Sequence, residues 1–321
     1  MTIHQRVDFI GIGAQKAGTS WLYRRLNELS EFSFTPIKEL HYFDRNKKYP
    51  STNELAEGEV TKRLANIQWV SSSARDLGQE FFRGNFRTFR WLWKWYFSNY
   101  NDAWYLSLFD HLKGIKGEIT PAYSMLDDED IRAMHALIPN LKVVLILRNP
   151  IDRAWSHYRF QLQKTPNASK QKINLHSLVD FMESDALVLR SDYIRTMNKF
   201  SNYFSKETFL VCFYDAISDN PQRLLSEIVK FLGGNPDKIQ TECNLYQMNN
   251  VSIKKDMPLE VREYLKKKYH DQIKELSDVY GGYFTKWYVD SYDIDVPTSN
   301  DSQILIPTTH VTKQTFPQMK K

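Results

Sequence analysis

Three apolar runs of strand length alternate along the chain with segments in which hydrophobic residues recur at helical spacing. The apolar runs cover residues 7–13, 142–147 and 208–214, and a shorter candidate covers residues 117–120. Helical patterns follow at residues 20–29, 150–163 and 221–232. Apolar runs of this length predict strands buried on both faces, and intervening helices predict that the strands are parallel. We therefore expect an α/β fold with a central parallel sheet flanked by helices.

Two regions depart from this alternation. Residues 51–112 form an aromatic-rich helical insertion, with thirteen aromatic residues between Phe81 and Phe109. From about residue 290 to 321 the chain is polar and punctuated by proline, which predicts a loosely ordered tail. Neither region has the pattern of an independent domain. We expect one domain over residues 1–321.

Composition and charge narrow the functional classes only slightly. Hydrophobic residues make up 42% of the chain and the net charge is +5, which suits a packed core and an anionic ligand. A balance this mildly basic gives no reason to expect nucleic acid as a partner. No apolar run is long enough to span a membrane, and the first ten residues do not resemble a secretory signal. We therefore expect a cytoplasmic protein.

The two cysteines do not have the spacing of metal ligands. Cys212 and Cys243 are the only cysteines in the sequence. Two reduced thiols are the expected state for a cytoplasmic enzyme, and a single disulfide is the alternative.

Residues 13–20 have the features of a phosphate loop. Their sequence, GAQKAGTS, lies between a predicted strand and a predicted helix and begins with the G-x-x-x-x-G of a P-loop. Glycines let backbone amides approach a phosphate, and the helix N-terminus favours negative charge. However, Thr19 and Ser20 follow where a nucleoside triphosphatase has Lys and Ser or Thr, and the lysine is displaced to Lys16. The loop predicts a P-loop-like domain whose ligand has a different phosphate arrangement.

This loop resembles that of a known enzyme family. Residues 15–22, QKAGTSWL, are similar to the 5′-phosphosulfate loop of sulfotransferases that use 3′-phosphoadenosine-5′-phosphosulfate (PAPS). The resemblance implies that Lys16 lies near the bridging oxygen of the leaving group and that Trp21 stacks near the adenine. Core packing in the first helical turn is the alternative for Trp21. The resemblance assigns the following residues to the 5′-phosphate: Lys16, Ala17, Gly18, Thr19 and Ser20.

A second anion site is predicted where the strand at residues 142–147 ends. Arg148 emerges there and Ser156 follows about two helical turns later, so a guanidinium and a hydroxyl can grip one phosphate. This Arg-x₇-Ser arrangement resembles the 3′-phosphate motif of the same family. Tyr214 resembles a residue that lies near the adenine. The glycine- and lysine-rich segment that completes the 3′-phosphate site in the family is not recognisable, and residues 249–255 match it poorly.

The candidate catalytic segment is residues 38–44, KELHYFD. Sulfuryl transfer requires the attacking hydroxyl or amine to lose a proton, which a carboxylate can accept. The segment closely resembles the catalytic segment of heparan sulfate glucosaminyl 3-O-sulfotransferases. This implies that Glu39 is the general base and that Lys38, His41 and Asp44 support it or the acceptor. A solvated Lys38–Glu39 pair and an ordinary packing histidine at position 41 are the alternatives.

Two further features bear on the acceptor. Residues 118–123, EITPAY, resemble a family segment near the active site, but Ile119 stands where the sugar-sulfotransferase relatives carry a lysine. In the insertion, helical spacing predicts that Trp104, Tyr105 and Phe109 belong to the core. The alternating Trp91, Trp93 and Trp95 could line an acceptor site.

The sequence as a whole predicts a PAPS-dependent sulfotransferase. We expect in-line transfer of the sulfuryl group to a hydroxyl or amine of the acceptor, with adenosine 3′,5′-bisphosphate (PAP) as product and no metal. The acceptor is expected to be a small molecule or a glycan, and a carbohydrate is the favoured class. A P-loop kinase or nucleoside triphosphatase is the main alternative, and it is disfavoured because the usual lysine and a Mg²⁺ carboxylate are not evident. A nucleotide-binding module without turnover is the other alternative.

Overall fold

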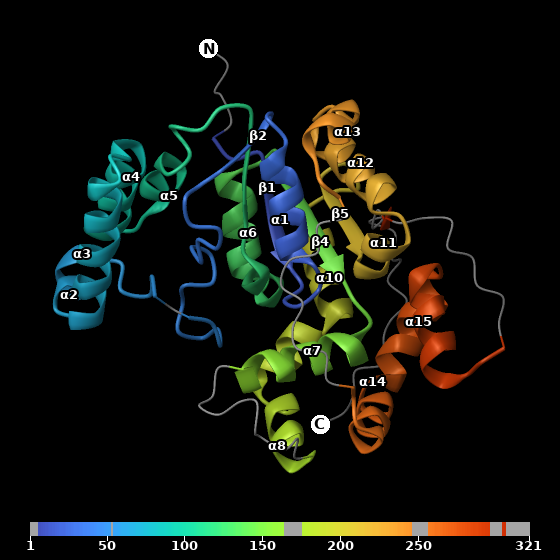
Figure 1. Ribbon diagram of the computed structural model, residues 1–321. Helices are drawn as coiled ribbons and strands as arrows, with labels where there is room; N and C mark the ends of the chain where they lie inside the picture. The colour runs from blue at the N-terminus through green and yellow to red at the C-terminus, as the bar shows by residue number, and fades with distance from the viewer. Residues whose placement is uncertain (1–5, 53, 164–174, 246–255, 296–303, 306–321) are drawn as a thin grey trace.

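The structure, a computed structural model, describes residues 6–52, 54–163, 175–245, 256–295 and 304–305 (Figure 1). Its six-stranded sheet has the order β2-β3-β1-β4-β5-β6. The strands are β1 (Phe9–Gly13), β2 (Phe32–Phe34), β3 (Ile115–Ile119), β4 (Lys142–Leu147), β5 (Phe209–Phe213) and β6 (Ile304–Leu305). Strands β1 to β5 are parallel, as expected, whereas β6 at the edge is antiparallel to β5.

The apolar runs became strands because their side chains are buried on both faces. Every residue of β1 and β5 is buried, and β4 is buried from Val143 onward. In the register of β1 and β3, Ile10 lies beside Glu118. The structure confirms the expected α/β fold, and the four predicted strands differ from the observed ones by at most a few terminal residues.

Helices cover both faces of the sheet. Helices α1 (Thr19–Glu28) and α12 (Pro221–Leu232) pack together on one face, and α6 (Asp128–Leu137) and α10 (Tyr193–Ser201) pack together on the other. Local chemistry sets the ends of α12. Its N-cap Asn220 accepts a hydrogen bond from the Arg223 amide, Pro221 opens the first turn, and Gly233 ends the helix with a φ of 94°.

A further group of helices lies beyond the carboxyl ends of the strands. The strand arrows of Figure 1 point toward α7 (Pro150–Gln163), α8 (Leu175–Met182) and α14 (Leu259–Tyr280). Helix α7 begins directly after β4, packs on α14 and has the bounds expected from the sequence. The remaining short helices are α9 (Asp185–Ser191), α11 (Tyr214–Asp219), α13 (Ile239–Glu242) and α15 (Tyr283–Tyr292), with 3₁₀ turns η1 (Pro121–Met125) and η2 (Pro236–Lys238).

Four helices form a cluster beside the sheet, within the predicted insertion (Figure 1). They are α2 (Val60–Leu64), α3 (Ile67–Phe82), α4 (Phe86–Phe97) and α5 (Asp102–Ser107). Trp104, Tyr105 and Phe109 are buried, as their spacing predicted. On helix α4, Trp91 and Trp95 stack inside the protein with ring centroids 5.5 Å apart, so neither lines an open site.

Further expectations concern the cysteines, membrane-spanning helices, metal ligands and the C-terminal tail. Cys212 and Cys243 are free thiols. Among the helices of the described ranges, none is both long and apolar enough to cross a bilayer. Within those ranges, no three acidic, histidine or cysteine side chains are grouped as metal ligands. Residues 249–255 lie outside the described residues. The same holds for most of the predicted tail, namely residues 296–303 and 306–321.

Candidate active site

The carboxyl ends of neighbouring parallel strands bring the two predicted phosphate sites together. The phosphate loop follows β1, and Arg148 follows β4. Arg148 Nη1 lies 3.4 Å from the carbonyl oxygen of Lys16, and the Arg148 guanidinium lies 4.3 Å from the centre of the Tyr214 ring. Ser156 is buried on α7. Ligands of open α/β sheets bind at this edge, so the location suits a nucleotide.

The phosphate loop has a backbone conformation that leaves the start of α1 open. Lys16 has a φ of 69° and Gly18, the N-cap of α1, has a φ of 97°. A Cβ on Gly18 would lie only 2.6 Å from Ile217 Cδ1 and 3.1 Å from Tyr214 Cδ2, so glycine is required twice over. Among the described residues, no side chain caps this helix, and its first turn contains no acidic residue. These features leave first-turn amides available to an anion.

Cationic side chains surround this edge. Lys16 Nζ lies 4.2 Å from the centre of the Phe160 ring. Burial lowers the pKa of Arg159, and the nearby charge of Arg148 lowers it further. Arg148 Nε is buried and has no hydrogen-bond partner among the described residues. An unsatisfied buried guanidinium nitrogen next to two other cations fits an anionic ligand such as a phosphate.

The other predicted residues of the loop occupy different environments. Ala17 is fully buried, so only its backbone can face a ligand, and Thr19 is nearly buried. Ser20 is exposed at the start of α1. Trp21 is half-buried and packs against the hydrophobic core, as the packing alternative expects, while part of its ring is open.

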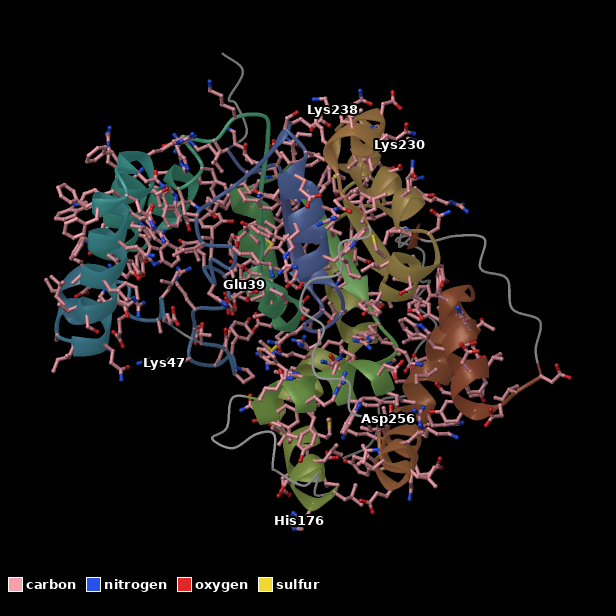
Figure 2. All side chains as sticks on the ribbon, viewed as in Figure 1. Glu39, Lys47, His176, Lys230, Lys238 and Asp256 are labelled. Carbon is pink, nitrogen blue, oxygen red and sulfur yellow. The ribbon has the colours of Figure 1, made fainter. Side chains whose placement is uncertain are left out.

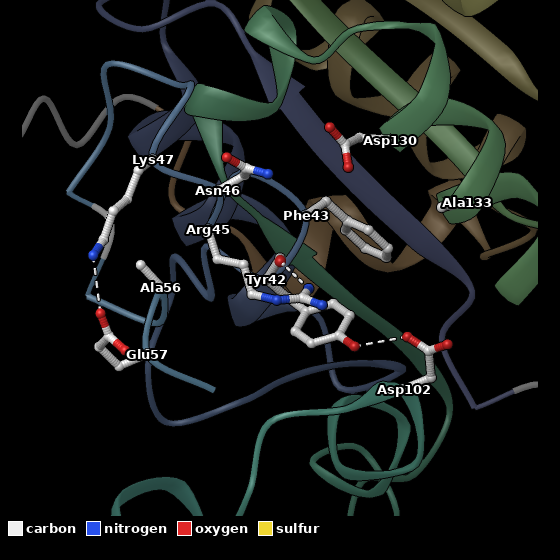
Figure 3. Close-up of a pocket in the computed structure, with 10 residues that line it drawn as sticks. All are labelled: Tyr42, Phe43, Arg45, Asn46, Lys47, Ala56, Glu57, Asp102, Asp130 and Ala133. Atoms are coloured by element: carbon white, nitrogen blue, oxygen red, sulfur yellow. Dashed lines mark hydrogen bonds and ion pairs between the residues drawn. The ribbon is translucent and has the colours of Figure 1, made fainter. Parts of the chain in front are cut away.

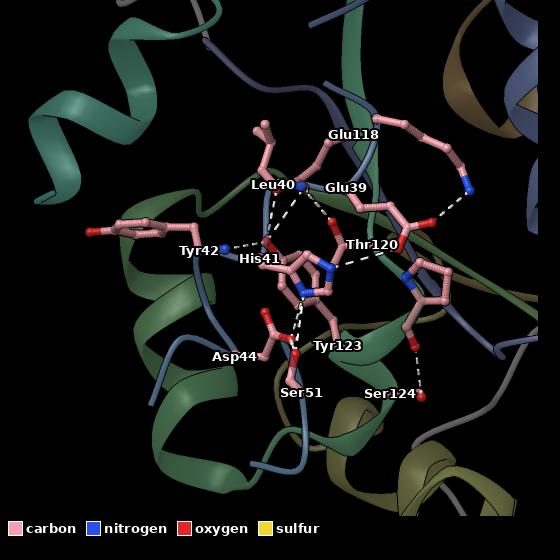
Figure 4. A network of polar contacts seen from close by, with 12 residues as sticks. Glu39, Leu40, His41, Tyr42, Asp44, Ser51, Glu118, Thr120, Tyr123 and Ser124 are labelled. Carbon is pink, nitrogen blue, oxygen red and sulfur yellow. Dashed lines mark hydrogen bonds and ion pairs between the residues drawn. The ribbon is translucent and has the colours of Figure 1, made fainter. Parts of the chain in front are cut away.

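The candidate catalytic segment carries a short chain of charged groups centred on Glu39 (Figure 4). Lys38 Nζ lies 3.0 Å from Glu39 Oε1, and His41 Nε2 lies 3.6 Å from Glu39 Oε2. On its other side, His41 Nδ1 lies 2.8 Å from Asp44 Oδ2, which also accepts a hydrogen bond from Ser51. The Glu39 side chain is 40% exposed, whereas Asp44 is buried. Of the two carboxylates in this chain of charged groups, Glu39 is therefore the one that an acceptor can reach.

The charges in this segment fix its protonation states at neutral pH. Burial raises the pKa of Glu39, but a hydrogen bond from His41 and the charge and hydrogen bond of Lys38 outweigh burial and lower it. Burial lowers the pKa of His41, but hydrogen bonds and charges from Asp44 and Glu39 raise it to about 10. Glu39 is thus ionised and His41 is a cation between two carboxylates. A protonated His41 orients Glu39 and cannot itself accept a proton.

A buried network anchors the backbone on either side of His41 (Figure 4). Glu118 on β3 is fully buried and accepts hydrogen bonds from Tyr105 Oη at 2.6 Å and Thr120 Oγ1 at 2.7 Å. The Leu40 amide donates to Thr120 Oγ1 at 3.0 Å and to Glu118 at 3.3 Å.

The same network continues to the other side of His41. The Tyr42 amide donates to Tyr123 Oη at 2.9 Å, and Tyr123 donates to Glu118 at 3.2 Å. His41 itself has a φ of 51°, an uncommon conformation that such anchoring can maintain. Burial raises the pKa of Glu118 to about 7, although its hydrogen bonds oppose the shift.

Sequence reasoning noted residues 118–123 but assigned no role to Glu118. The available signal was an acidic residue inside an apolar strand, since a buried carboxylate requires several partners. Ile119, which replaces the lysine of the relatives, is buried, and a Cβ at Gly11 would lie 3.0 Å from its side chain. Position 119 therefore serves sheet packing here.

The sequence did not indicate a chemical role for two arginines near this segment. Arg190 on α9 donates to the Pro50 carbonyl at 2.9 Å. Burial and the charge of Arg153 lower the pKa of Arg190 to about 10, and Asp44 opposes this shift. Arg153 on α7 is fully buried and donates to Ser191 on α9. Arg153 thus links α7 to α9, and Arg190 links α9 to the loop that carries Asp44.

A cavity of about 480 Å³ begins where the candidate catalytic segment ends (Figure 3). Tyr42 Oη donates to Asp102 at 2.7 Å, and the Arg45 guanidinium lies 4.0 Å from the centre of the Tyr42 ring. Figure 2 labels Glu39 in this segment and Lys47, which lies beyond its end and lines the cavity. The cavity lining is mostly polar and contains both charge signs: Tyr42, Phe43, Arg45, Asn46, Lys47, Ala56, Glu57, Asp102, Asp130 and Ala133.

Comparison with known proteins shows similarity to sulfotransferases. The sequence profile of the sulfotransferase domain matches residues 6–290. Human heparan sulfate glucosamine 3-O-sulfotransferase 6 is 30% identical over 135 residues, which cover 41% of this chain and 39% of the human protein. The mouse protein of the same name is 29% identical over the same length. The chain thus matches about two fifths of the length of these relatives.

A solved structure shares the fold. The crystal structure of a sulfotransferase from Alicyclobacillus acidocaldarius has a TM-score of 0.58 and 18% sequence identity. The similarity covers 85% of this chain and 95% of the bacterial protein. At this identity the comparison establishes the fold of the chain.

Proposed function

The chain belongs to the sulfotransferase domain family, and we propose that it transfers a sulfuryl group from PAPS to a hydroxyl or amine of a carbohydrate acceptor. One observation carries the proposal. The uncapped phosphate loop beside Arg148 and the ionised, accessible Glu39 belong to segments that leave the same edge of one parallel sheet. A donor site and a base for the acceptor are the two parts that this reaction needs.

In this proposal the phosphate loop and Arg148 hold the donor. The amides at the start of α1, together with Lys16, Thr19 and Ser20, bind the 5′-phosphate. Arg148 and Ser156 bind the 3′-phosphate, and Trp21 and Tyr214 contact the adenine. The buried, unsatisfied Arg148 Nε and the contact between Arg148 and the Lys16 carbonyl support two adjacent phosphate sites. Charge-assisted hydrogen bonds of this kind are strong.

The chemical step proceeds by in-line displacement. Glu39 accepts the proton of the attacking hydroxyl or amine while that atom forms a bond to sulfur. The bond between sulfur and the bridging phosphate oxygen breaks, and PAP leaves with the electron pair. The Lys16 ammonium offsets the charge that develops on this oxygen. The proton on Glu39 then passes to water. His41, held by Asp44, keeps the carboxylate of Glu39 oriented.

A carbohydrate acceptor is supported by two features. The candidate catalytic segment resembles that of heparan sulfate glucosaminyl 3-O-sulfotransferases, and the match to a human protein of that name supports the likeness. The polar cavity next to the segment offers carboxylate, amide and guanidinium groups to a hydroxyl-rich molecule. The packed Ile119 removes one cationic contact, so we expect an acceptor less acidic than heparan sulfate.

Transfer from radiolabelled PAPS to panels of glycans, phenols, alcohols and amines tests the proposal. We expect sulfation of at least one glycan, and calorimetric binding of PAP that is tighter than binding of ATP and unchanged by EDTA. Tighter binding of ATP, or loss of PAP binding in EDTA, would favour a kinase or triphosphatase. Binding of PAP without transfer to any acceptor would favour a nucleotide-binding module.

A further inference from the structure

The hairpin of α3 and α4 presents aromatic side chains to solvent. Phe82 is 89% exposed, Phe86 59%, Trp93 55% and Phe81 54%. Within the described ranges these are all the exposed aromatic side chains, and they lie within thirteen consecutive residues. Scattered exposed hydrophobic residues are normal, but a concentration of this kind marks an interaction surface.

These side chains form one continuous ridge. We define the aromatic ridge as Phe81, Phe82, Phe86, Phe89, Trp93 and Phe97. Ring centroids lie 6.1 Å apart for Phe81–Phe86 and for Phe81–Phe89, 6.4 Å for Phe89–Trp93, and 4.7 Å for Trp93–Phe97. On α4 the ridge residues recur every three or four positions, which places them on one side of the helix.

The opposite side of α4 already forms the core of the insertion. Trp91, Leu92, Trp95 and Tyr96 are buried there, and Trp91 Nε1 donates to the Leu108 carbonyl at 2.9 Å. The helix is therefore aromatic on both sides. On the ridge side, only Phe89 and Phe97 pack partly against the core. The exposure of the other four ridge residues is therefore not explained by packing within the described residues.

Basic residues accompany the ridge. Arg83, Arg87, Arg90 and Lys94 lie along the same stretch, and residues 81–101 contain no aspartate or glutamate. Arg83 pairs with Glu80 at 3.0 Å, and Arg87 donates to the His111 carbonyl. Arg90 is exposed and has no hydrogen bond or ion pair among the described residues. Glu80 offsets the charge of Arg83, whereas the carbonyl partner of Arg87 is neutral. Arg87 and Arg90 therefore keep the surface around the ridge positively charged.

We propose that the α3–α4 hairpin docks on an anionic lipid surface, with the aromatic ridge in the headgroup region and the basic residues against the lipid charges. Aromatic rings favour this depth of a bilayer, and each nearby basic residue strengthens binding to an anionic surface by roughly fivefold. A glycan-binding aromatic residue would instead line a concave site, whereas the high exposure of Phe82 means that it projects from the hairpin turn. The hairpin lies on the membrane and does not cross it.

Vesicle co-sedimentation of the full chain tests this docking. The test variant replaces Phe82, Phe86 and Trp93 by serine. The control variant replaces three exposed aliphatic residues elsewhere, Val188, Leu259 and Val279, by serine. Vesicles of phosphatidylcholine alone are compared with vesicles containing 30% phosphatidylserine, at low and high salt. Melting temperature and PAP binding establish that each variant is folded.

We expect the unaltered chain and the control variant to bind phosphatidylserine vesicles, with binding weakened by salt and by omission of the anionic lipid. The ridge variant should bind at least tenfold more weakly. Equal binding by the ridge variant, or no binding by the unaltered chain, would overturn the proposal. A ridge-dependent dimer in sedimentation velocity without vesicle binding would identify a second copy as the occupant. Ridge-dependent binding of a sulfated glycan without vesicle binding would identify an acceptor surface.

Discussion

The phosphate loop with Arg148 and the candidate catalytic segment lie at the same edge of the sheet, but they are held in place differently. The loop and Arg148 directly follow β1 and β4, so the backbone of two regular strands positions them. The catalytic segment contains neither helix nor strand, and side chains of β3, η1 and the insertion anchor it. Substitution of a single residue that contacts the donor should therefore change donor binding. Turnover should also depend on buried residues that contact neither the donor nor the acceptor.

The largest expected effect separates the two regions completely. Glu39→Gln keeps the size of the side chain but removes its ability to accept a proton. Turnover should fall by about 10²–10⁴-fold, while PAP affinity stays nearly unchanged because the nucleotide is bound elsewhere. Single-turnover transfer and calorimetry on the same sample measure both quantities. Because Glu39 is 40% exposed, the melting temperature should hardly change.

Near-normal transfer by Glu39→Gln would return Glu39 to the role of a solvated partner of Lys38. In the unaltered protein His41 would not be the base either, because Asp44 and Glu39 together raise its pKa to about 10. A comparable loss of transfer and of PAP binding would indicate instead that the substitution disturbs the fold.

Arg148→Ala should affect the opposite property. Loss of a charge-assisted hydrogen bond is worth roughly 1.5–3 kcal/mol, so PAP should bind about 10- to 150-fold more weakly. Binding of 5′-AMP, which lacks the 3′-phosphate, is the matched control and should change little. Calorimetric titration with both ligands makes the comparison. Equal losses for the two nucleotides would remove Arg148 from the 3′-phosphate site.

Glu118→Gln tests whether the buried network controls the catalytic segment. The amide group would face donors that now bind a carboxylate, which should lower the free energy of unfolding by about 1–3 kcal/mol. Turnover should fall while PAP affinity is retained, because the anchored Leu40 and Tyr42 amides flank His41 and Leu40 directly follows Glu39. Tyr105→Phe, which removes one donor to Glu118, is the milder control. Urea unfolding and single-turnover transfer measure the two effects, and unchanged turnover in a destabilised Glu118→Gln protein would limit Glu118 to a structural role.

The smallest effect on turnover is expected from pH changes above the pKa of Glu118, which burial raises to about 7. Because the pKa of Glu39 is lowered and that of His41 is raised to about 10, both charges persist from about pH 6.5 to 9. The raised pKa of His41 means that its stabilising contribution is complete below its ordinary pKa of 6.5 and declines as pH rises through about 10. The free energy of unfolding of the unaltered protein and of His41→Gln, compared across this pH range, measures the decline in stability. A steep rise in turnover around pH 6.5 that persists in Glu118→Gln would show that His41 is neutral in the working enzyme, whereas a rise that this variant loses reports ionisation of Glu118.

The sequence alone determined the strands, the phosphate loop and the position of Arg148. Each of these is a local pattern: an apolar run long enough to cross the sheet, followed by glycine, arginine or proline where the chain must turn. Parallel strands then place their ends at one edge, so the nearness of the loop to Arg148 followed from the order of elements. The grouping of Glu39, His41 and Asp44 followed from the resemblance of residues 38–44 to a family segment, and its ends are only five positions apart.

Tertiary structure decided the rest. Strands β2 and β6 have three and two residues, too few to form a pattern, and they exist because a neighbouring strand offers backbone partners. Packing of α4 against the chain around Leu108 turned Trp91 inward and left Trp93 outside. Glu118 is buried against Tyr105 from the insertion, and Leu40 reaches it across 78 residues of sequence. A buried carboxylate requires donors from several segments at once, and only the folded chain brings those donors together.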